Sequence, residues 1–141
     1  MHMTQAEIGT GKLSDLVFCG IRVSIGIIFL LHGIAKLGNE MFIGWMSTFG
    51  ISPEMAMIIA IAEIVPGILL IFGVLSRLAS SILAIIMVAA IFIVKGATSI
   101  TGEQGIEFDL VLLAGVLVIA IAGPGRLSIS HVIKKIPRSL H

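Results

Sequence analysis

The sequence is poor in cysteine, in charge and in aromatic residues, and each shortage excludes a class of protein. Its single cysteine, Cys19, allows neither an internal disulfide nor a Cys-x-x-Cys redox pair. Charged residues make up 12% of the 141 residues, and the net charge is +1. The chain has no basic face interleaved with aromatic residues, so nucleic acid is not expected as a partner.

Metal and haem sites also lack their usual patterns. A carboxylate-bridged metal bundle needs repeated Glu-x-x-His sites, and none occur. A bis-histidine haem needs two facing histidines inside the membrane, and only His32 lies within an apolar run. We therefore expect no metal and no intrinsic cofactor.

Hydrophobic residues are abundant, at 57% of the chain, and the mean hydropathy is +1.16. A soluble domain of this size cannot bury so much apolar surface. The apolar residues form runs of roughly the 20 residues that cross a bilayer, at about 16–37, 53–75, 78–95 and 106–122. Because helices satisfy their own backbone in lipid, the sequence predicts an all-α integral membrane four-helix bundle, with residues 1–141 forming one domain in the lipid bilayer.

Small residues lie inside all four spans, where they allow helix backbones to approach closely. They are Gly26, Gly33, Ala60, Gly67, Gly73, Ala84, Gly115 and Ala120.

The distribution of lysine and arginine predicts the orientation, since cytoplasmic loops are enriched in both. One side of the predicted bundle has six, and the other has Lys36 and Lys95. The six are Lys12, Arg77, Arg126, Lys134, Lys135 and Arg138. We therefore expect both termini in the cytoplasm. A polar stretch precedes the first span, so a cleavable signal peptide is not expected.

Two segments are predicted to lie along the membrane surface. In the first connection an apolar stripe with i, i+3, i+4, i+7 spacing is formed by Phe42, Trp45, Met46 and Phe49. It is either an interfacial anchor or a lid over an outward-facing pocket. Residues 126–141 form a basic amphipathic tail, which either rests on anionic lipid or docks a soluble partner.

Ionisable residues inside the apolar runs are the candidate functional residues, because such groups are costly in lipid and face the bundle interior. Helical geometry places Arg22, His32 and Lys36 on one face of the first span. Glu63 lies ten residues after Pro53, about 15 Å into the second span. By depth, either Arg22 or His32 could pair with it, and the sequence does not choose. Glu107 lies at the start of the fourth span, where the helix dipole favours a carboxylate.

These residues together resemble the DoxX family. The first span has Arg22 and then His32-Gly-x-x-Lys36-Leu, and the second has Glu63 and then Gly73-x-x-x-Arg77-Leu. The chain continues to a Gly-Pro-Gly-Arg-x-Ser ending at residues 123–128, so the resemblance covers about residues 18–130. Pro66 stands where the family has the first glycine of a pair, and Ser130 where it usually has an aspartate.

The resemblance implies four-helix membrane proteins linked to redox systems in the prokaryotic plasma membrane. Relatives include the DoxD subunit of thiosulfate:quinone oxidoreductase, and other members resemble membrane partners of sulfur-handling and superoxide-detoxifying enzymes. It maps the candidate ligand-binding positions onto Arg22, His32, Lys36, Glu63 and Glu107.

Three functions follow as hypotheses. The leading one is a redox-linked membrane subunit that binds a quinone in the bundle and receives electrons from a partner oxidoreductase subunit. The second is a non-catalytic anchor or assembly factor for a soluble oxidoreductase. The third is a small-solute or proton-coupled transporter with Glu63 as the carrier acid. A homo-oligomer is compatible with each.

Overall fold

The computed structural model describes residues 11–94, 96, 100–101, 106–125 and 127–128. Within these ranges the fold is all-α, as predicted. It contains α1 (Lys12–Lys36), α2 (Glu40–Ser47), α3 (Pro53–Phe72), α4 (Ser76–Ala89), the π-helical segment η1 (Ala90–Val94) and α5 (Glu107–Ala122). Three helical stretches are long and apolar enough to cross a membrane, namely Lys12–Lys36, Pro53–Phe72 and Ser76–Ile93. The helix in the predicted fourth span, α5, has 16 residues, which is about 24 Å.

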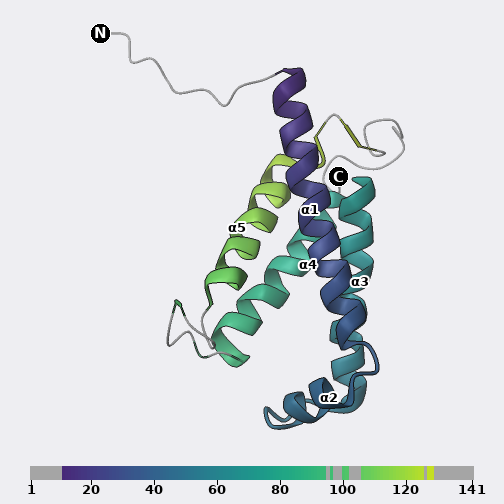
Figure 1. Cartoon of the computed structure of the whole chain (residues 1–141), viewed down its shortest axis with the longest axis vertical. Helices are drawn as coiled ribbons and strands as arrows, with labels where there is room; N and C mark the ends of the chain where they lie inside the picture. The colour runs from purple at the N-terminus through teal and green to yellow at the C-terminus, as the bar shows by residue number, and fades with distance from the viewer. Residues whose placement is uncertain (1–10, 95, 97–99, 102–105, 126, 129–141) are drawn as a thin grey trace.

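The helices form two packed pairs. The most extensive contacts join α1 to α3 and α4 to α5, and the contact between α3 and α4 holds the pairs together. The short α2 lies across one end of the molecule, against α3 (Figure 1). The start of α1 and the end of α5 lie toward the opposite end (Figure 1).

Glycine brings α1 and α3 into backbone contact, as the small residues predicted. A Cβ on Gly67 would lie 2.9 Å from the carbonyl oxygen of Gly26, and one on Gly33 would lie 2.9 Å from that of Ala60. Real Cβ atoms essentially never come so close to backbone. These contacts also fix the register: the last turn of α1 lies level with the middle of α3, near Ala60 and Ile64.

The ends of α3 show why the predicted connection to α4 is displaced. The helix begins with the Ser52 hydroxyl accepting from the Met55 amide and with Pro53 in the first turn. It ends at Gly73, whose φ of 68° is left-handed. The chain turns through Gly73–Leu75, earlier than the gap between the predicted spans 53–75 and 78–95, and Ser76 and Arg77 both lie in α4.

Apolar side chains cover the outside of the molecule as well as its core. Buried Phe29, Leu83 and Ile119 belong to the core between the pairs, whereas Ile85, Val111 and Ile121 are 71–80% exposed. Water would penalise this outer surface and hydrocarbon would not. The molecule is therefore a membrane protein whose apolar helices are solvated by the lipid bilayer. Of the predicted 126–141 tail, only Leu127 and Ser128 are among the described residues.

Candidate functional site

An ion pair between α1 and α3 is the centre of the candidate site. Lys36 Nζ donates to Glu63 Oε1 at 2.6 Å, with the lysine side chain 31% exposed and the carboxylate side chain 2% exposed. The two partners considered from the sequence, Arg22 and His32, are both wrong. The depth count placed the outer ends of the two spans level, but α1 ends beside the middle of α3. Lys36, on the last turn of α1, therefore reaches Glu63.

The second oxygen of Glu63 is buried and has no hydrogen-bond partner among the described residues. It belongs to a residue that lines a cavity of about 340 Å³. Such a carboxylate oxygen is costly in an apolar surrounding unless a donor reaches it. Among the described residues, a residue of the cavity wall thus keeps one carboxylate oxygen without a donor.

The cavity is largely apolar, and each of the described helices contributes at least one residue to its lining. Its charged residues are Lys36, Glu63 and Asp109. The remaining lining consists of Phe42, Trp45, Met46, Ile51, Ile59, Ile86, Met87, Ala89, Ala90 and Ile93. Ligand pockets have this make-up, with apolar walls and few polar groups, and volumes of roughly 300–1,000 Å³.

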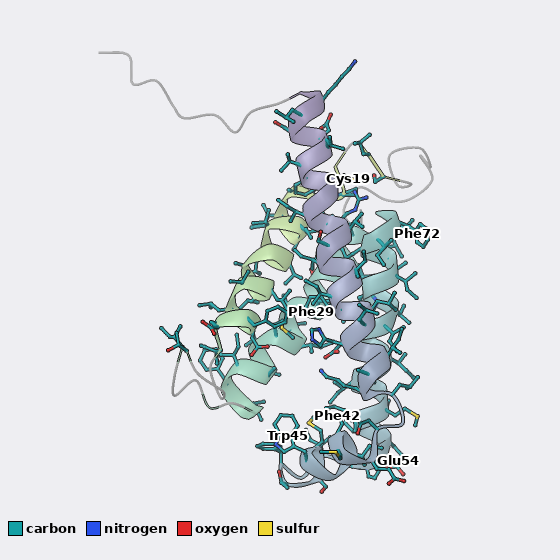
Figure 2. All side chains as sticks on the ribbon, in the orientation of Figure 1. Cys19, Phe29, Phe42, Trp45, Glu54 and Phe72 are labelled. Carbon is teal, nitrogen blue, oxygen red and sulfur yellow. The ribbon has the colours of Figure 1, made fainter. Side chains whose placement is uncertain are left out.

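The predicted surface stripe forms one wall of the cavity. The Asn39 side chain accepts from the amides of Met41 and Phe42 and so starts α2. Figure 2 shows Phe42 and Trp45 on the side of α2 that faces the bundle. Phe42, Trp45 and Met46 line the cavity, and Lys36 Nζ lies 5.4 Å from the centre of the Phe42 ring. Phe49 lies outside it, edge-on against Trp45.

Two lining features were missed from the sequence. Asp109 was not among the candidate residues, yet it lines the cavity from the first turn of α5. The π-helical η1 continues α4 where an ordinary α-helix was expected, and its residues Ala90 and Ile93 line the cavity. An acidic residue in the first turn of a predicted helix is a sequence signal that could have pointed to Asp109. The sequence pattern contains no comparable signal for the π-helix. Short π segments often occur at functional sites.

Arg22 is 2% exposed and lies away from the cavity lining. Its Nε donates to the Leu70 carbonyl at 2.8 Å, and its two terminal nitrogens donate to the carbonyls of Pro124 and Leu127, the latter at 3.0 Å. One of them also contacts Cys19 Sγ at 3.6 Å. The guanidinium thus joins α1, the end of α3 and the segment that follows α5.

His32 and Glu107 also lie outside the cavity lining. The His32 side chain is exposed and packs edge-on against Phe108 of α5, with ring centres 5.7 Å apart. Glu107 is exposed in the first turn of α5. Of the five predicted positions, the structure brings only Lys36 and Glu63 together.

Comparison with models of known protein families shows to which family this chain belongs. The profile described as DoxX matches residues 17–96, more than half of the chain. This chain belongs to the DoxX family.

Two curated relatives support the assignment of this DoxX protein. It is 35% identical over 104 residues to "Putative oxidoreductase CatD" of Bacillus subtilis (strain 168), covering 73% of this chain and 76% of the relative. It is 32% identical over 134 residues to "Uncharacterized membrane protein Rv3486" of Mycobacterium tuberculosis (strain ATCC 25618 / H37Rv), covering 84% and 82%. No solved structure gives a significant match.

The motif residues of this DoxX protein divide into two groups by position. Lys36 and Glu63 line the cavity beside α2. Arg22 instead binds carbonyls of the Gly-Pro-Gly ending, far along the chain. The residues that carry the resemblance therefore belong to one candidate ligand site and one structural clamp.

Proposed function

We propose that this protein is a redox-linked membrane subunit that binds a quinone-type ring in the cavity between α2 and the bundle. The observation that carries the proposal is the buried, unpartnered Glu63 Oε2 in an apolar cavity of about 340 Å³. A ring with polar substituents fits an apolar wall that carries the Lys36–Glu63 pair. The oxidoreductase name of the Bacillus subtilis relative supports a redox context.

The polar groups of the cavity can bind both kinds of ring substituent. The Lys36 ammonium has three donors, of which Glu63 takes one. The others can donate to a ring carbonyl, and Glu63 Oε2 can accept from a ring hydroxyl. With only one cysteine the chain has no dithiol pair of its own, so a partner oxidoreductase would supply the electrons.

The proposal is tested by titrating the purified protein with a short-chain benzoquinone and the matching hydroquinone. Trp45 is the sole tryptophan and lines the cavity, so its fluorescence reports binding there. We expect saturable quenching in the wild type. Lys36→Met removes a charged donor, worth about 1.5–3 kcal/mol, and should weaken binding by about tenfold or more.

His32→Ala is the matched control, because His32 belongs to the same helix and lies outside the cavity lining. It should bind as the wild type does. Non-saturating quenching of equal size in all three proteins would mean partition into detergent and would refute the ligand site.

The anchor function is a second candidate, and Arg22 favours it. The guanidinium holds the chain at Pro124 and Leu127, where the basic tail of residues 126–141 begins. In this alternative the buried cations order the helices and present the tail to a soluble oxidoreductase. It predicts that Lys36→Met reduces retention of the partner without any ligand-specific defect.

We further propose that the chain crosses a prokaryotic plasma membrane four times, with both termini in the cytoplasm. The lysine and arginine distribution supports this orientation. The start of α1 and the end of α5 lie toward one end of the molecule, as an even number of crossings requires (Figure 1). In this orientation α2 and the cavity lie toward the outer face.

A further inference from the structure

The charged side chains of the cavity are unevenly placed. Among the described residues, Glu63, Asp109 and Lys36 line it, and Lys36 is paired with Glu63. One lysine donor is already engaged by Glu63 Oε1 at 2.6 Å. The atom left open is an acceptor, Glu63 Oε2, in a side chain that is 2% exposed.

A carboxylate in an ion pair accepts hydrogen bonds and donates none. The ligand group that meets Glu63 Oε2 must therefore carry a hydrogen. A ring hydroxyl does so. A ring carbonyl would set an acceptor against an acceptor and leave the buried oxygen without a donor, which is the costly arrangement.

The position of Lys36 makes the two carboxylate oxygens of Glu63 different from each other. Its ammonium lies at the Glu63 carboxylate and 5.4 Å from the centre of the Phe42 ring. It is therefore held on the Oε1 side by the carboxylate and the aromatic face together. The two oxygens of Glu63 are thus unequal, with Oε1 neutralised by lysine and Oε2 open.

We propose that the cavity selects the reduced, hydroxyl-bearing form of its ring ligand, a hydroquinone, over the oxidised quinone. Glu63 Oε2 accepts from one ring hydroxyl, and the apolar walls hold the ring. This inference rests on the proposed quinone-type ligand and specifies which oxidation state the resting site binds. A protein of this kind belongs where a membrane hydroquinone is taken up or released.

The test compares three ring compounds of matched size under anaerobic conditions, with Trp45 fluorescence as the readout. They are a short-chain benzohydroquinone, the corresponding benzoquinone, and the 1,4-dimethyl ether, which keeps the ring but has no O–H. Affinity is taken from the midpoint of saturation, because quinones quench fluorescence more deeply than hydroquinones do. We expect the hydroquinone to bind at least about tenfold tighter than either other compound, equivalent to about 1.4 kcal/mol.

Glu63→Gln supplies a variant with an opposite expectation. The glutamine amide offers a donor as well as an acceptor, so the quinone should gain affinity and the tenfold preference should disappear. The comparison of hydroquinone with its dimethyl ether needs no variant, so it decides the matter even if Glu63→Gln fails to fold.

The outcomes separate the two proposals. Saturable binding with equal affinity for hydroquinone and ether, or tighter binding of the quinone, overturns the selection and leaves the ring site standing. An unchanged preference in folded Glu63→Gln also overturns it, because the preference would then arise elsewhere. If no compound saturates, the proposed ring site itself fails, and the selection fails with it.

Discussion

Buried Arg22 and half-buried Lys36 are cations on the same helix with different roles, and the difference follows from their chemistry. Arg22 has a planar fork of donors, which here reaches carbonyls at Leu70, Pro124 and Leu127. Lys36 is a compact charge on a flexible stem, and it meets one carboxylate beside a cavity. The guanidinium fixes three segments of backbone, whereas the ammonium can also serve a ligand.

Replacing Arg22 with methionine should destabilise the protein strongly. The side-chain volume is largely kept, but three carbonyls lose a charged donor in a buried place. The Leu70 carbonyl keeps the Gly73 amide as a donor at 3.2 Å, but the carbonyls of Pro124 and Leu127 lose their charged donor, which costs about 1–3 kcal/mol each. We therefore expect a loss of at least about 2 kcal/mol in the free energy of unfolding. Thermal unfolding in detergent, followed by circular dichroism, measures it.

Lys12→Met is the control for this experiment, because Lys12 is an exposed cation at the start of the same helix. It should unfold as the wild type does. Equal stability of the Arg22 and Lys12 variants would show that the carbonyl contacts of Arg22 contribute little.

At the scale of elements, the α1–α3 contact depends on glycine. A Cβ on Gly67 meets the Gly26 carbonyl and the Leu30 amide nitrogen, both at 2.9 Å. Neither atom can move without moving a helix. The close approach therefore sets the separation of the two helices that carry Lys36 and Glu63.

Gly67→Ala should force α1 and α3 apart and destabilise the protein by about 1–3 kcal/mol, the usual cost of overpacking. Gly20→Ala is the matched control, because nothing lies within 4 Å of its added Cβ. Alanine is a better helix former by about 1 kcal/mol, so this variant should be neutral or slightly more stable. The same ranking should appear in hydroquinone affinity, and a Gly67→Ala protein as stable as Gly20→Ala would contradict the packing account.

The sequence carried enough information for the helices but not for their register. Apolar runs predicted α1, α3 and α4 to within a few residues, and the stripe at 42–49 predicted α2. The pairing of Glu63 could not be predicted, because it depends on how far α1 slides along α3. That offset is fixed by tertiary contacts at Gly33 and Gly67, which periodicity within a single helix does not encode.

The sequence predicted the type of site, a buried acid near an apolar pocket, but only some of the residues that line it. The cost of a charge in lipid correctly marked Glu63 as a buried acid. The aromatic stripe, predicted as an anchor or a lid, contributes Phe42, Trp45 and Met46 to the cavity lining. His32 was misplaced because helical geometry put it on the same face as Arg22 and Lys36, whereas its ring packs on Phe108 of α5. Asp109 was missed because a charge at the start of a span is usually solvated.

For the whole molecule, the proposed topology makes a prediction about access from each side of the membrane. In a Cys19→Ser background, Glu54→Cys should react with a membrane-impermeant maleimide in intact cells, since Glu54 is exposed near α2 (Figure 2). Lys12→Cys, exposed at the other end of the molecule, should react only after the cells are opened. The reverse pattern would place the termini outside and refute the proposed orientation.

The clamp formed by Arg22 has a consequence for how the protein is made. Arg22 enters the membrane with the first helix, but two of its carbonyl partners lie 102 and 105 residues later in the chain. While the ribosome is still synthesising those residues, the guanidinium has to find water or lipid headgroups at the membrane surface. The segment that contains Pro124 and Leu127 therefore completes the hydrogen bonding of Arg22. A nascent chain that stops before Pro124 would expose an unsatisfied arginine to the quality-control proteases of the membrane.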